Sequence, residues 1–368
     1  MINLMRTVIF RKSLFLTLLL CVAFSPLLPA QAAPPRQGEP QQPDQRRTRT
    51  LYLPNALNGY RPPRDPVVVG VYPQGWQGLE STMENELDAL SNWSGLKLTI
   101  SATFIGLTES YNNIYKQMIV PWESGYTPFI NLMTTATARD IARGSADGHL
   151  RNWASAVRAY AEGGRRLVYI APLPEMNGEW TSYGLDPANF KAAFMRMVNL
   201  FAQEGVPDES VRWVFAPNGW SKPEDDFENY YPGHQWVDAV GFSAYNYGHC
   251  PYPGQKPDWA HVDTIALPYI ERMRAMAPGT PIFLTQFATS SATGSGRDAE
   301  AKNEWFRHNY TLLAETEGLR GILYFNKDDS VCDLAFFTPN RRYPGYRDAV
   351  TGPGFDYLGP VELMQAGE

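Results

Sequence analysis

The fold is decided by a stretch near the middle of the chain, Leu167-Val168-Tyr169-Ile170-Ala171, which is apolar without interruption. Such a run is typical of a strand that is covered on both faces in a parallel sheet. The chain continues as Leu173-Pro174-Glu175-Met176-Asn177-Gly178-Glu179-Trp180. A carboxylate and an aromatic residue therefore follow closely on a buried strand, which is the position of catalytic acids in barrel enzymes.

Further apolar runs, rich in β-branched residues, are spread along the chain. They cover residues 67–71, 101–105, 128–133, 211–216, 237–242, 282–287 and 321–325. Amphipathic helices are expected between several of them; one begins at Asp186 with Pro187 in its first turn and ends before Gly205. Strands and helices that alternate about eight times predict a (β/α)8 TIM barrel, with a doubly wound sheet as the alternative.

The chain divides into four parts by composition. Residues 1–32 combine basic residues, an apolar run at 13–24 and the motif Ala30-Gln31-Ala32, which is the pattern of a secretory signal peptide. Residues 33–65 are rich in Pro, Gln and Arg and predict a linker or an arm. We expect one barrel domain over residues 66–350 and a C-terminal tail over residues 351–368. The mature protein is then secreted or periplasmic.

The chain is acidic. It has 32 Lys and Arg against 38 Asp and Glu, and removal of residues 1–32 takes away three basic and no acidic groups. A surface of this sign disfavours nucleic acid as a partner. The apolar core of the signal, about a dozen residues, is shorter than the ~20 residues that a membrane span needs. We therefore expect a monomer without membrane contact once the signal is removed.

Two cysteines, Cys250 and Cys332, remain after signal removal. They lie in the loops after the sixth and the eighth predicted strand, at one rim of the barrel, and disulfides persist in exported proteins. We predict that they are bonded; the alternative is two unpaired buried thiols. The five histidines show no spacing such as His-Glu-x-x-His, so we expect no metal site and no cofactor.

The motif after the fourth predicted strand resembles that of a known family. It reads Glu175-Met176-Asn177-Gly178-Glu179-Trp180, with Tyr183-Gly184 further on, and is similar to the acid/base motif of glycoside hydrolase family 26, best known for β-mannanases and related β-glycanases. Three later segments also resemble that family: Trp213-Val214-Phe215-Ala216-Pro217-Asn218, the stretch over residues 230–246, and Tyr324-Phe325-Asn326-Lys327-Asp328. The resemblance spans most of the predicted barrel.

The resemblance implies roles for individual residues. Glu175 is the acid/base, and Gln286, at the end of the seventh predicted strand, stands where the family carries its nucleophilic glutamate. Tyr245 is the tyrosine that hydrogen-bonds the nucleophile, Trp180 is a wall against which a sugar ring stacks, and Tyr324 stands where a tryptophan commonly lines the site.

Further residues of these segments are expected to bind the substrate, a polysaccharide or an oligosaccharide. The complete predicted set is Asn177, Trp180, Asn218, Trp220, Tyr245, Asn246, Tyr247, Tyr324 and Asn326. Trp76 is a weaker candidate. Each residue also has a structural alternative. Aromatic rings can pack loops on one another, polar side chains can cap turns, and Gln286 can be a buried amide satisfied by Tyr245.

Gln286 limits the chemistry that this motif set allows. Retaining glycosidases need two carboxyl groups about 5 to 5.5 Å apart, one to protonate the leaving oxygen and one to attack the anomeric carbon. The amide oxygen of glutamine is a weak nucleophile and brings no charge to stabilise an oxocarbenium-like transition state. The sequence therefore indicates a scaffold and a substrate class without the usual nucleophile.

Two functions fit these observations. The first is an exported glycoside hydrolase acting on the O-glycosidic bonds of a β-linked polysaccharide, of mannan or β-glucan type. It needs a surrogate carboxylate, for which Glu179, Asp328 and Asp329 are candidates, and a gap of roughly 6.5 to 9.5 Å would make the outcome inverting. The second is a catalytically inactive glycan-binding protein that keeps the cleft. Sequence alone does not separate them, because fold and cleft are the same in both.

Overall fold

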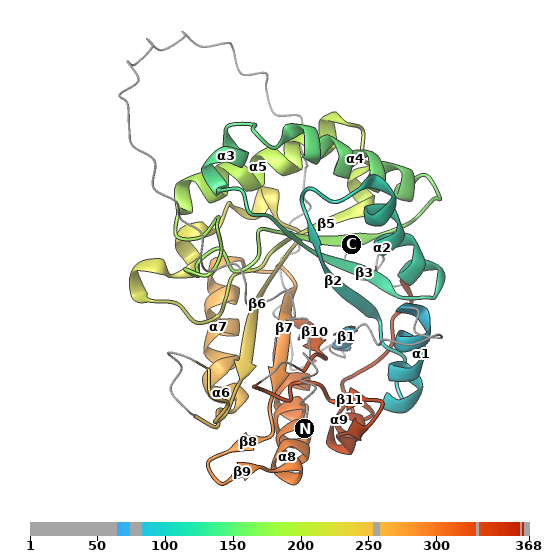
Figure 1. Ribbon diagram of the computed structural model, residues 1–368, viewed down its shortest axis with the longest axis vertical. Helices are drawn as coiled ribbons and strands as arrows, with labels where there is room; N and C mark the ends of the chain where they lie inside the picture. Colours follow the sequence, from blue (N-terminus) through green and yellow to red (C-terminus); the bar gives the residue numbers. More distant parts are fainter. Residues whose placement is uncertain (1–64, 74–82, 253–257, 329–330, 361–362, 364–368) are drawn as a thin grey trace, which may run out of the picture. The chain divides into compact units, whose positions relative to one another are not determined.

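The strands of the barrel and the helices around them are seen in Figure 1, which shows the computed structural model. The structure describes residues 65–73, 83–252, 258–328, 331–360 and 363. The predicted signal peptide, nearly all of the predicted arm, Trp76 and Asp329 lie outside the described residues. No described helix is both long enough and apolar enough to cross a membrane.

Parallel strands close into a barrel. In chain order they are β1 (Val68–Tyr72), β2 (Ile100–Gly106), β3 (Thr127–Met133), β4 (Val168–Pro172), β5 (Val211–Phe215), β6 (Ala239–Asn246), β7 (Ile282–Thr289) and β10 (Leu319–Phe325). Around the barrel their order is β1-β10-β7-β6-β5-β4-β3-β2. Every predicted apolar run overlaps one of these strands. The predicted (β/α)8 barrel is therefore confirmed, and the doubly wound alternative is wrong.

Helices lie outside the strands and cover them (Figure 1). They are α1 (Met83–Ser94), α2 (Tyr111–Glu123), α3 (Ala138–Ala142), α4 (Asp147–Ala161), α5 (Pro187–Gln203), α6 (Val262–Ile265), α7 (Leu267–Met276), α8 (Ala299–Ala314) and α9 (Pro344–Val350). Short 3-10 turns are η1 (Asp208–Ser210), η2 (Pro223–Asp225), η3 (Phe227–Tyr230) and η4 (His234–Trp236). Two small hairpins pair β8 (Ala292–Thr293) with β9 (Gly296–Arg297), and β11 (Phe337–Thr338) with β12 (Arg341–Arg342).

Helix α5 illustrates how the local sequence sets the helix ends. The side chain of Asp186 accepts a hydrogen bond from the backbone N–H of Asn189 at 3.3 Å, and Pro187 is the first helical residue. Both features are favoured at a helix start, because the first N–H groups have no partner inside the helix. The helix is followed by Gly205 at a φ of 76°, a left-handed conformation that glycine adopts without strain.

Side chains on the barrel strands alternate between two apolar cores, because successive residues of a strand face opposite ways. On β6, Ala239 belongs to the core inside the barrel and Val240 to the core between barrel and helices. The same alternation continues to the end of the strand. Ser243 and Tyr245 therefore face inward, and Ala244 and Asn246 face outward.

Strand β7 carries an irregularity that breaks its alternation at Gln286. Leu284 pairs with Phe242 of β6, but the next ladder pair joins Gln286 to Ser243, and a matching register shift occurs toward β10. Thr285 is the extra residue, as in a β-bulge, which bends a strand and redirects a side chain. Leu284 and Phe287 both pack in the outer core. The bulge thus turns Gln286 to the inner face, where strict alternation from Leu284 would have sent it outward.

The loops on either side of β7 are tied to each other and to helix α8. Cys250, after β6, is disulfide-bonded to Cys332, after β10, with their Cα atoms 5.6 Å apart, as predicted. The fully buried ammonium of Lys302 in α8 donates to the carbonyl oxygens of Asp333, Leu334 and Ala335 at 2.5, 3.1 and 3.1 Å. Three consecutive carbonyls next to the disulfide are thereby satisfied by one side chain.

The described part of the C-terminal segment packs against the barrel. The backbone N–H of Val67 donates to the carbonyl of Gly354 at 2.9 Å, and Tyr357 Oη donates to the carbonyl of Gly125 at 2.9 Å. Leu358 and Leu363 pack against the core inside the barrel. The segment that we predicted as a tail therefore covers apolar side chains at the N-terminal end of the barrel strands.

Candidate functional site

Glu175 is held in an unusual backbone conformation just beyond β4. Leu173 and Glu175 have φ angles of 52° and 57°, in the left-handed region that costs a non-glycine residue about 1–2 kcal/mol. Hydrogen bonds to the neighbouring strands hold them there: the N–H of Leu173 donates to Leu132 at 2.9 Å, and that of Glu175 to Ala216 at 2.8 Å. Strained residues that their surroundings over-determine cluster at functional sites.

The carboxylate of Glu175 accepts hydrogen bonds from three side chains. Oε1 accepts from Ser243 Oγ and from Asn218 Nδ2, the latter at 3.1 Å, and Oε2 accepts from Trp180 Nε1 at 2.8 Å. Trp180 is 52% exposed, and a Cβ on Gly178 would lie 2.3 Å from its ring, so only glycine lets the ring lie there. Both lone pairs of Oε1 are thus used by Ser243 and Asn218, while Oε2 faces the rim, where Trp180 is its donor.

Asn177 positions Asn218 and does not face the mouth. It is buried, its Nδ2 donates to the carbonyl of Asn218 at 2.9 Å, and its Oδ1 accepts from the N–H of Asn218 at 2.8 Å. This pair of bonds joins the loop after β4 to the loop after β5. The structure thus shows a positioning role for Asn177, whose contact with substrate stays a prediction, whereas Asn218 Nδ2 donates to Glu175.

Gln286 lies at the same end of the barrel as Glu175. Its Oε1 accepts a hydrogen bond from Tyr245 Oη at 3.0 Å, and the residue is 6% exposed. Strand β6 links the two sites, because Ser243 donates to Glu175 and Tyr245, two residues further on the same face, donates to Gln286. The structure thus brings together the residues that we predicted for the acid/base and nucleophile positions.

An aromatic cluster lines the mouth beside Gln286. Its rings belong to Tyr72, Phe104 and Phe325, which lie within 5.1 to 6.3 Å of one another between centroids. Phe325 also meets Tyr245 edge-on at 6.0 Å. We call Tyr72, Phe104 and Phe325 the aromatic wall. Phe104 and Phe325 are partly exposed, and none of the three was predicted from the sequence.

The hydroxyl groups of Tyr72 and Tyr245 remain hydrogen-bond donors over the physiological pH range. Burial raises the pKa of both hydroxyls well above its usual range, and the charge of Glu175 adds to each rise. Tyr72 Oη donates to the carbonyl of Thr285 at 2.5 Å and accepts from Asn131 Nδ2 at 2.7 Å. This chain fixes the backbone of the bulge next to Gln286.

Tyr324 does not line the mouth in this structure, and its contact with substrate stays a prediction. It belongs to the outer core, is fully buried, and its hydroxyl donates to the carbonyl of Leu334 at 2.7 Å. The inward-facing residue is its neighbour Phe325. The two aromatic residues are adjacent at the end of β10, and the period-2 alternation of a strand decides which one faces the mouth.

Asn246 and Asn326 hold loops in this structure, and their contacts with substrate stay predictions. Both are buried. Asn246 Oδ1 accepts from the N–H groups of Gly248 and Ala260, at 3.2 and 3.0 Å. Asn326 Oδ1 accepts from those of Phe336 and Phe337, at 2.9 and 3.1 Å. Buried amides of this kind replace missing backbone partners in irregular loops.

Exposed aromatic side chains stand at the rim. Trp220 is 60% exposed and follows Asn218, whose Oδ1 accepts from the Trp220 N–H at 3.0 Å. Tyr247 is partly exposed and stacks on Tyr245, with ring centroids 5.0 Å apart at 10°. Trp180, Trp220 and Tyr247 thus stay accessible, as a stacking role requires.

The described surrogate carboxylates are engaged by cations. Glu179 pairs with Lys222 at 3.1 Å. Asp328 accepts from Arg341 Nη2 at 2.7 and 2.5 Å and from the N–H of Ala335 at 3.0 Å. Asp329 lies outside the described residues. Within those residues no group of three or more His, Cys, Asp or Glu is arranged to hold a metal ion.

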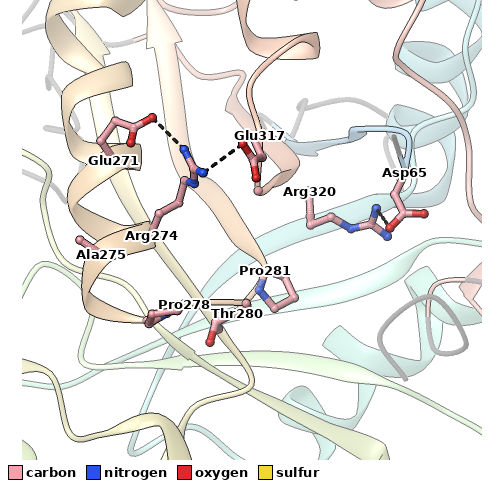
Figure 2. Close-up of a pocket in the computed structure, with 12 residues that line it drawn as sticks. Asp65, Glu271, Arg274, Ala275, Pro278, Thr280, Pro281, Glu317 and Arg320 are labelled. Carbon is pink, nitrogen blue, oxygen red and sulfur yellow. Dashed lines mark hydrogen bonds and ion pairs between the residues drawn. The ribbon is translucent and has the colours of Figure 1, made fainter. Parts of the chain in front are cut away.

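A pocket at the opposite end of the barrel has a different character (Figure 2). It is lined by the end of α7 and the starts of β7 and β10. Arg274 lies between Glu271 and Glu317, 3.0 Å from each, and Arg320 pairs with Asp65 at 2.8 Å. Its charges are paired with one another, and this face of a TIM barrel usually serves stability. The candidate site is therefore the mouth with Glu175 and Gln286.

Comparisons with known proteins agree with this fold. Residues 147–261 match the model of glycosyl hydrolase family 26. Endoglucanase H of Acetivibrio thermocellus is 25% identical over 265 residues, which are 65% of this chain and 26% of that protein. The chain spans about a quarter of the length of the curated relatives that it matches.

Solved structures show the same fold at low identity. A modular endo-β-1,4-mannanase from Cellulomonas fimi aligns with a TM-score of 0.60 at 14% identity, covering 81% of this chain and 74% of that one. A β-mannanase from a symbiotic protist of the termite Reticulitermes speratus, complexed with gluco-manno-oligosaccharide, aligns with a TM-score of 0.54 at 13% identity, covering 81% and 90%. The chain is thus a (β/α)8 TIM barrel. More narrowly, its residues 147–261 are similar to glycosyl hydrolase family 26.

Proposed function

We propose that the mouth of the barrel binds a β-linked polysaccharide of mannan or β-glucan type and does not cleave it by the two-carboxylate route. The observation that carries the proposal is the pair formed by Tyr245 and Gln286. A retaining enzyme needs an ionised carboxylate there, and an uncharged amide neither attacks the anomeric carbon nor stabilises positive charge on it. The proposed role is therefore that of a glycan-binding protein.

The position of Gln286 supports its assignment to the nucleophile site. It lies in the second half of β7 (Ile282–Thr289), the bulge directs it inward, and Tyr245 donates to its amide oxygen. Ser243 pairs with Gln286 in the ladder and also donates to Glu175. Strand β6 thus carries the hydrogen-bond donors to both Glu175 and Gln286. This shared strand is consistent with Glu175 and Gln286 lying on either side of one glycosidic bond.

The sugar class is supported by the accessible aromatic side chains and by the relatives. Trp180 and Trp220 expose more than half of their surfaces next to Glu175 and Asn218. Exposed tryptophans that flank a polar mouth suit the apolar faces of pyranose rings. The named relatives are an endoglucanase and mannanases, one of them complexed with gluco-manno-oligosaccharide. We propose the same sugar class for this chain.

Hydrolysis through a surrogate carboxylate is the second candidate. It is favoured by Glu175, which keeps a set of three donors inside the segment that matches the family. The described surrogates weigh against it, because Glu179 and Asp328 are ion-paired to Lys222 and Arg341. A general base must be free to accept a proton from water.

Calorimetry with mannohexaose and cellohexaose tests the binding proposal. We expect Trp180→Ala to weaken binding of the preferred sugar about tenfold, equivalent to about 1.4 kcal/mol. Arg274→Ala, at the opposite end of the barrel, is the matched control and should bind like the wild type. Reducing-end release from mannan and β-glucan should be absent. Absence of binding to both sugars would refute the proposal, and release that Glu175→Gln abolishes would favour hydrolysis.

We also propose that the protein is exported. The signal-like composition of residues 1–32 and the disulfide between Cys250 and Cys332 support this, because structural disulfides persist in oxidising compartments. Expression of the full chain in a bacterium should yield extracytoplasmic protein whose N-terminus, read by mass spectrometry, follows Ala32. An intact N-terminus on cytoplasmic protein would contradict export.

A further inference from the structure

We propose that Lys327 forms a subsite for an anionic substituent, a carboxylate or a sulfate, on the polysaccharide that the mouth binds. The inference rests on the proposed function, because it uses the same mouth and keeps the same sugar class. It adds that the backbone of mannan or β-glucan type carries charged groups. Lys327 comes two residues after Phe325, where the chain leaves β10 (Leu319–Phe325) at the mouth end of the barrel.

The side chain of Lys327 lies against the aromatic wall. Its Nζ is 6.0 Å from the ring centroid of Phe325, and both residues are partly exposed. Phe325 in turn contacts Tyr72 and Phe104, with ring centroids 5.6 and 6.3 Å apart. A cation above a ring of this wall can meet a charged substituent on a sugar that lies against the same wall. The ammonium is therefore placed beside the mouth.

The ammonium of Lys327 has no close counterion in the part of the chain that the structure describes. Among these residues it forms neither a hydrogen bond nor an ion pair. Glu86, in the first turn of α1, attracts it without forming an ion pair with it. Burial lowers the pKa of the ammonium, and the attraction of Glu86 offsets only part of that fall. A partly buried cation without a close partner is costly, and an anion bound beside it reduces this cost.

Neighbouring groups leave the charge of Lys327 available to a ligand. Arg341 donates to Asp328, the residue after Lys327, and Lys302 donates to three backbone carbonyls. Strand β7 lies next to β10 in the barrel, and its residue at the mouth, Gln286, is uncharged. A glutamate at residue 286 would bring an anion to the strand beside β10. The amide in its place leaves this side of the mouth open to an anion from the ligand.

The charges of the mouth lie on opposite sides and can orient a charged glycan. Around the barrel, β10 is four strands from β4 in either direction, through β7, β6 and β5 or through β1, β2 and β3. The ammonium after β10 therefore lies across the mouth from the carboxylate of Glu175 after β4. The chain as a whole has 38 Asp and Glu against 32 Lys and Arg. Because this net charge repels a polyanion, tighter binding of a charged sugar requires a local cation.

Matched sugars test the inference on the wild-type protein. Oxidation of the primary hydroxyl groups of cellohexaose and mannohexaose gives carboxylates at C6 along the chain, and methyl esters of these products keep the size without the charge. By calorimetry we expect the oxidised form of the preferred sugar to bind about tenfold tighter than its ester. A 6-O-sulfated form separates the two sources of charge. A gain with either anion supports the subsite, and equal binding of charged and neutral forms overturns it.

Variants assign the gain to Lys327. Lys327→Met removes the charge and keeps a long side chain, so the tenfold ratio between the charged sugar and its ester should fall below about twofold. Lys327→Arg should retain most of the ratio, because it keeps the charge. Lys116→Met, at an exposed position of α2, removes the same charge from the outer surface and should keep the wild-type ratio. A ratio that survives Lys327→Met, or that falls equally in Lys116→Met, overturns the subsite.

A labelling experiment tests the subsite without any variant. Acetylation of lysines by an N-hydroxysuccinimide ester, followed by peptide mass spectrometry, should be slower at Lys327 in the presence of the oxidised sugar than in the presence of its ester. The rate at Lys116 is the internal control. Unchanged labelling of Lys327 under saturating oxidised sugar overturns the subsite.

The neutral sugars separate failure of this inference from failure of the proposed function. If cellohexaose or mannohexaose binds and charge brings no gain, the inference is wrong and the proposed function stands. If neither the neutral nor the charged sugars bind, the proposed function itself is wrong.

Discussion

The ends of β4 and β7 face each other across one mouth but differ in chemistry. At the end of β4, a carboxylate is surrounded by three donors and lies within the segment that matches glycosyl hydrolase family 26. At the end of β7, an amide accepts from Tyr245 and lies beyond that segment. The comparison teaches that two positions at one mouth can differ in chemistry. The position after β4 is a carboxylate with three side-chain donors, and the position in β7 is an uncharged amide whose oxygen accepts from Tyr245.

The two ends are also held by different means. Glu175 is fixed through the backbone: the N–H of Leu173 donates to Leu132 in β3, and the N–H of Glu175 donates to Ala216 just after β5. Gln286 is fixed from outside, since the loops after β6 and β10 flank β7 and are joined by a disulfide. Removing the disulfide that joins the loops on either side of β7 should therefore leave Glu175 in place. The expected effects below run from the largest to the smallest.

Loss of the disulfide should have the largest effect on stability. Cys250 and Cys332 are 82 residues apart in sequence, and in the chain-entropy model a loop of that length is worth about 4.5 kcal/mol. Urea unfolding of a Cys250→Ser/Cys332→Ser double variant against the wild type measures it. Hydrogen exchange should rise over residues 247–252 and 331–337 and stay unchanged over residues 173–178. Faster exchange around Glu175 would mean that the two ends are not held independently.

Lys302 should make stability depend on pH. Burial lowers the pKa of its ammonium to about 7 in the folded protein. Because the folded pKa lies below the unfolded one, the unfolded chain binds more protons above pH 7, and stability rises with pH there. Between pH 7 and pH 9 the free energy of unfolding should increase by about 1.4 kcal/mol per pH unit. In Lys302→Met the free energy of unfolding should depend less steeply on pH than in the wild type. Denaturant titrations at several pH values measure both dependences, and equal slopes against pH would contradict this prediction.

The donor to Glu175 should be worth more than the donor to Gln286. Ser243→Ala removes a hydrogen bond to a carboxylate, for which we expect a loss of about 2 kcal/mol of unfolding free energy. Ser243→Thr, which keeps the hydroxyl, is the matched control and should recover part of that loss. If Ser243→Ala unfolds at the same denaturant concentration as the wild type, the donor set around Glu175 contributes nothing to stability.

Tyr245→Phe should have the smallest effect. It removes a bond between two neutral groups, so we expect a loss of about 1 kcal/mol. In a Gln286→Glu background the same substitution should cost more, because the hydroxyl then donates to a carboxylate. A double-mutant cycle by urea unfolding measures the difference. Equal costs in both backgrounds would show that Tyr245 does not bond the side chain at residue 286.

Much of the fold could be predicted from the sequence, because the barrel strands are largely buried on both faces and contain runs rich in apolar residues. The same property hides which residues face inward. Tyr324 and Phe325 are both apolar and adjacent, and only the ladder with β1 and β7 shows that Phe325 faces the mouth. The bulge that directs Gln286 inward likewise depends on register with two neighbouring strands. Hydrogen bonds between distant segments, such as that from Ser243 to Glu175, leave no local pattern.

The central claim is that Gln286 lies opposite Glu175, at the position where a retaining glycosidase carries its nucleophilic carboxylate. Measuring hydrolysis by Gln286→Glu tests this claim most directly. A carboxylate restored at the end of β7 should create retaining hydrolysis of a mannan or β-glucan that the wild type binds but does not cleave. Adding Glu175→Gln should abolish the new activity, because acid and nucleophile act as a unit. A folded Gln286→Glu protein that binds the sugar and releases no more reducing ends than the wild type would contradict the account.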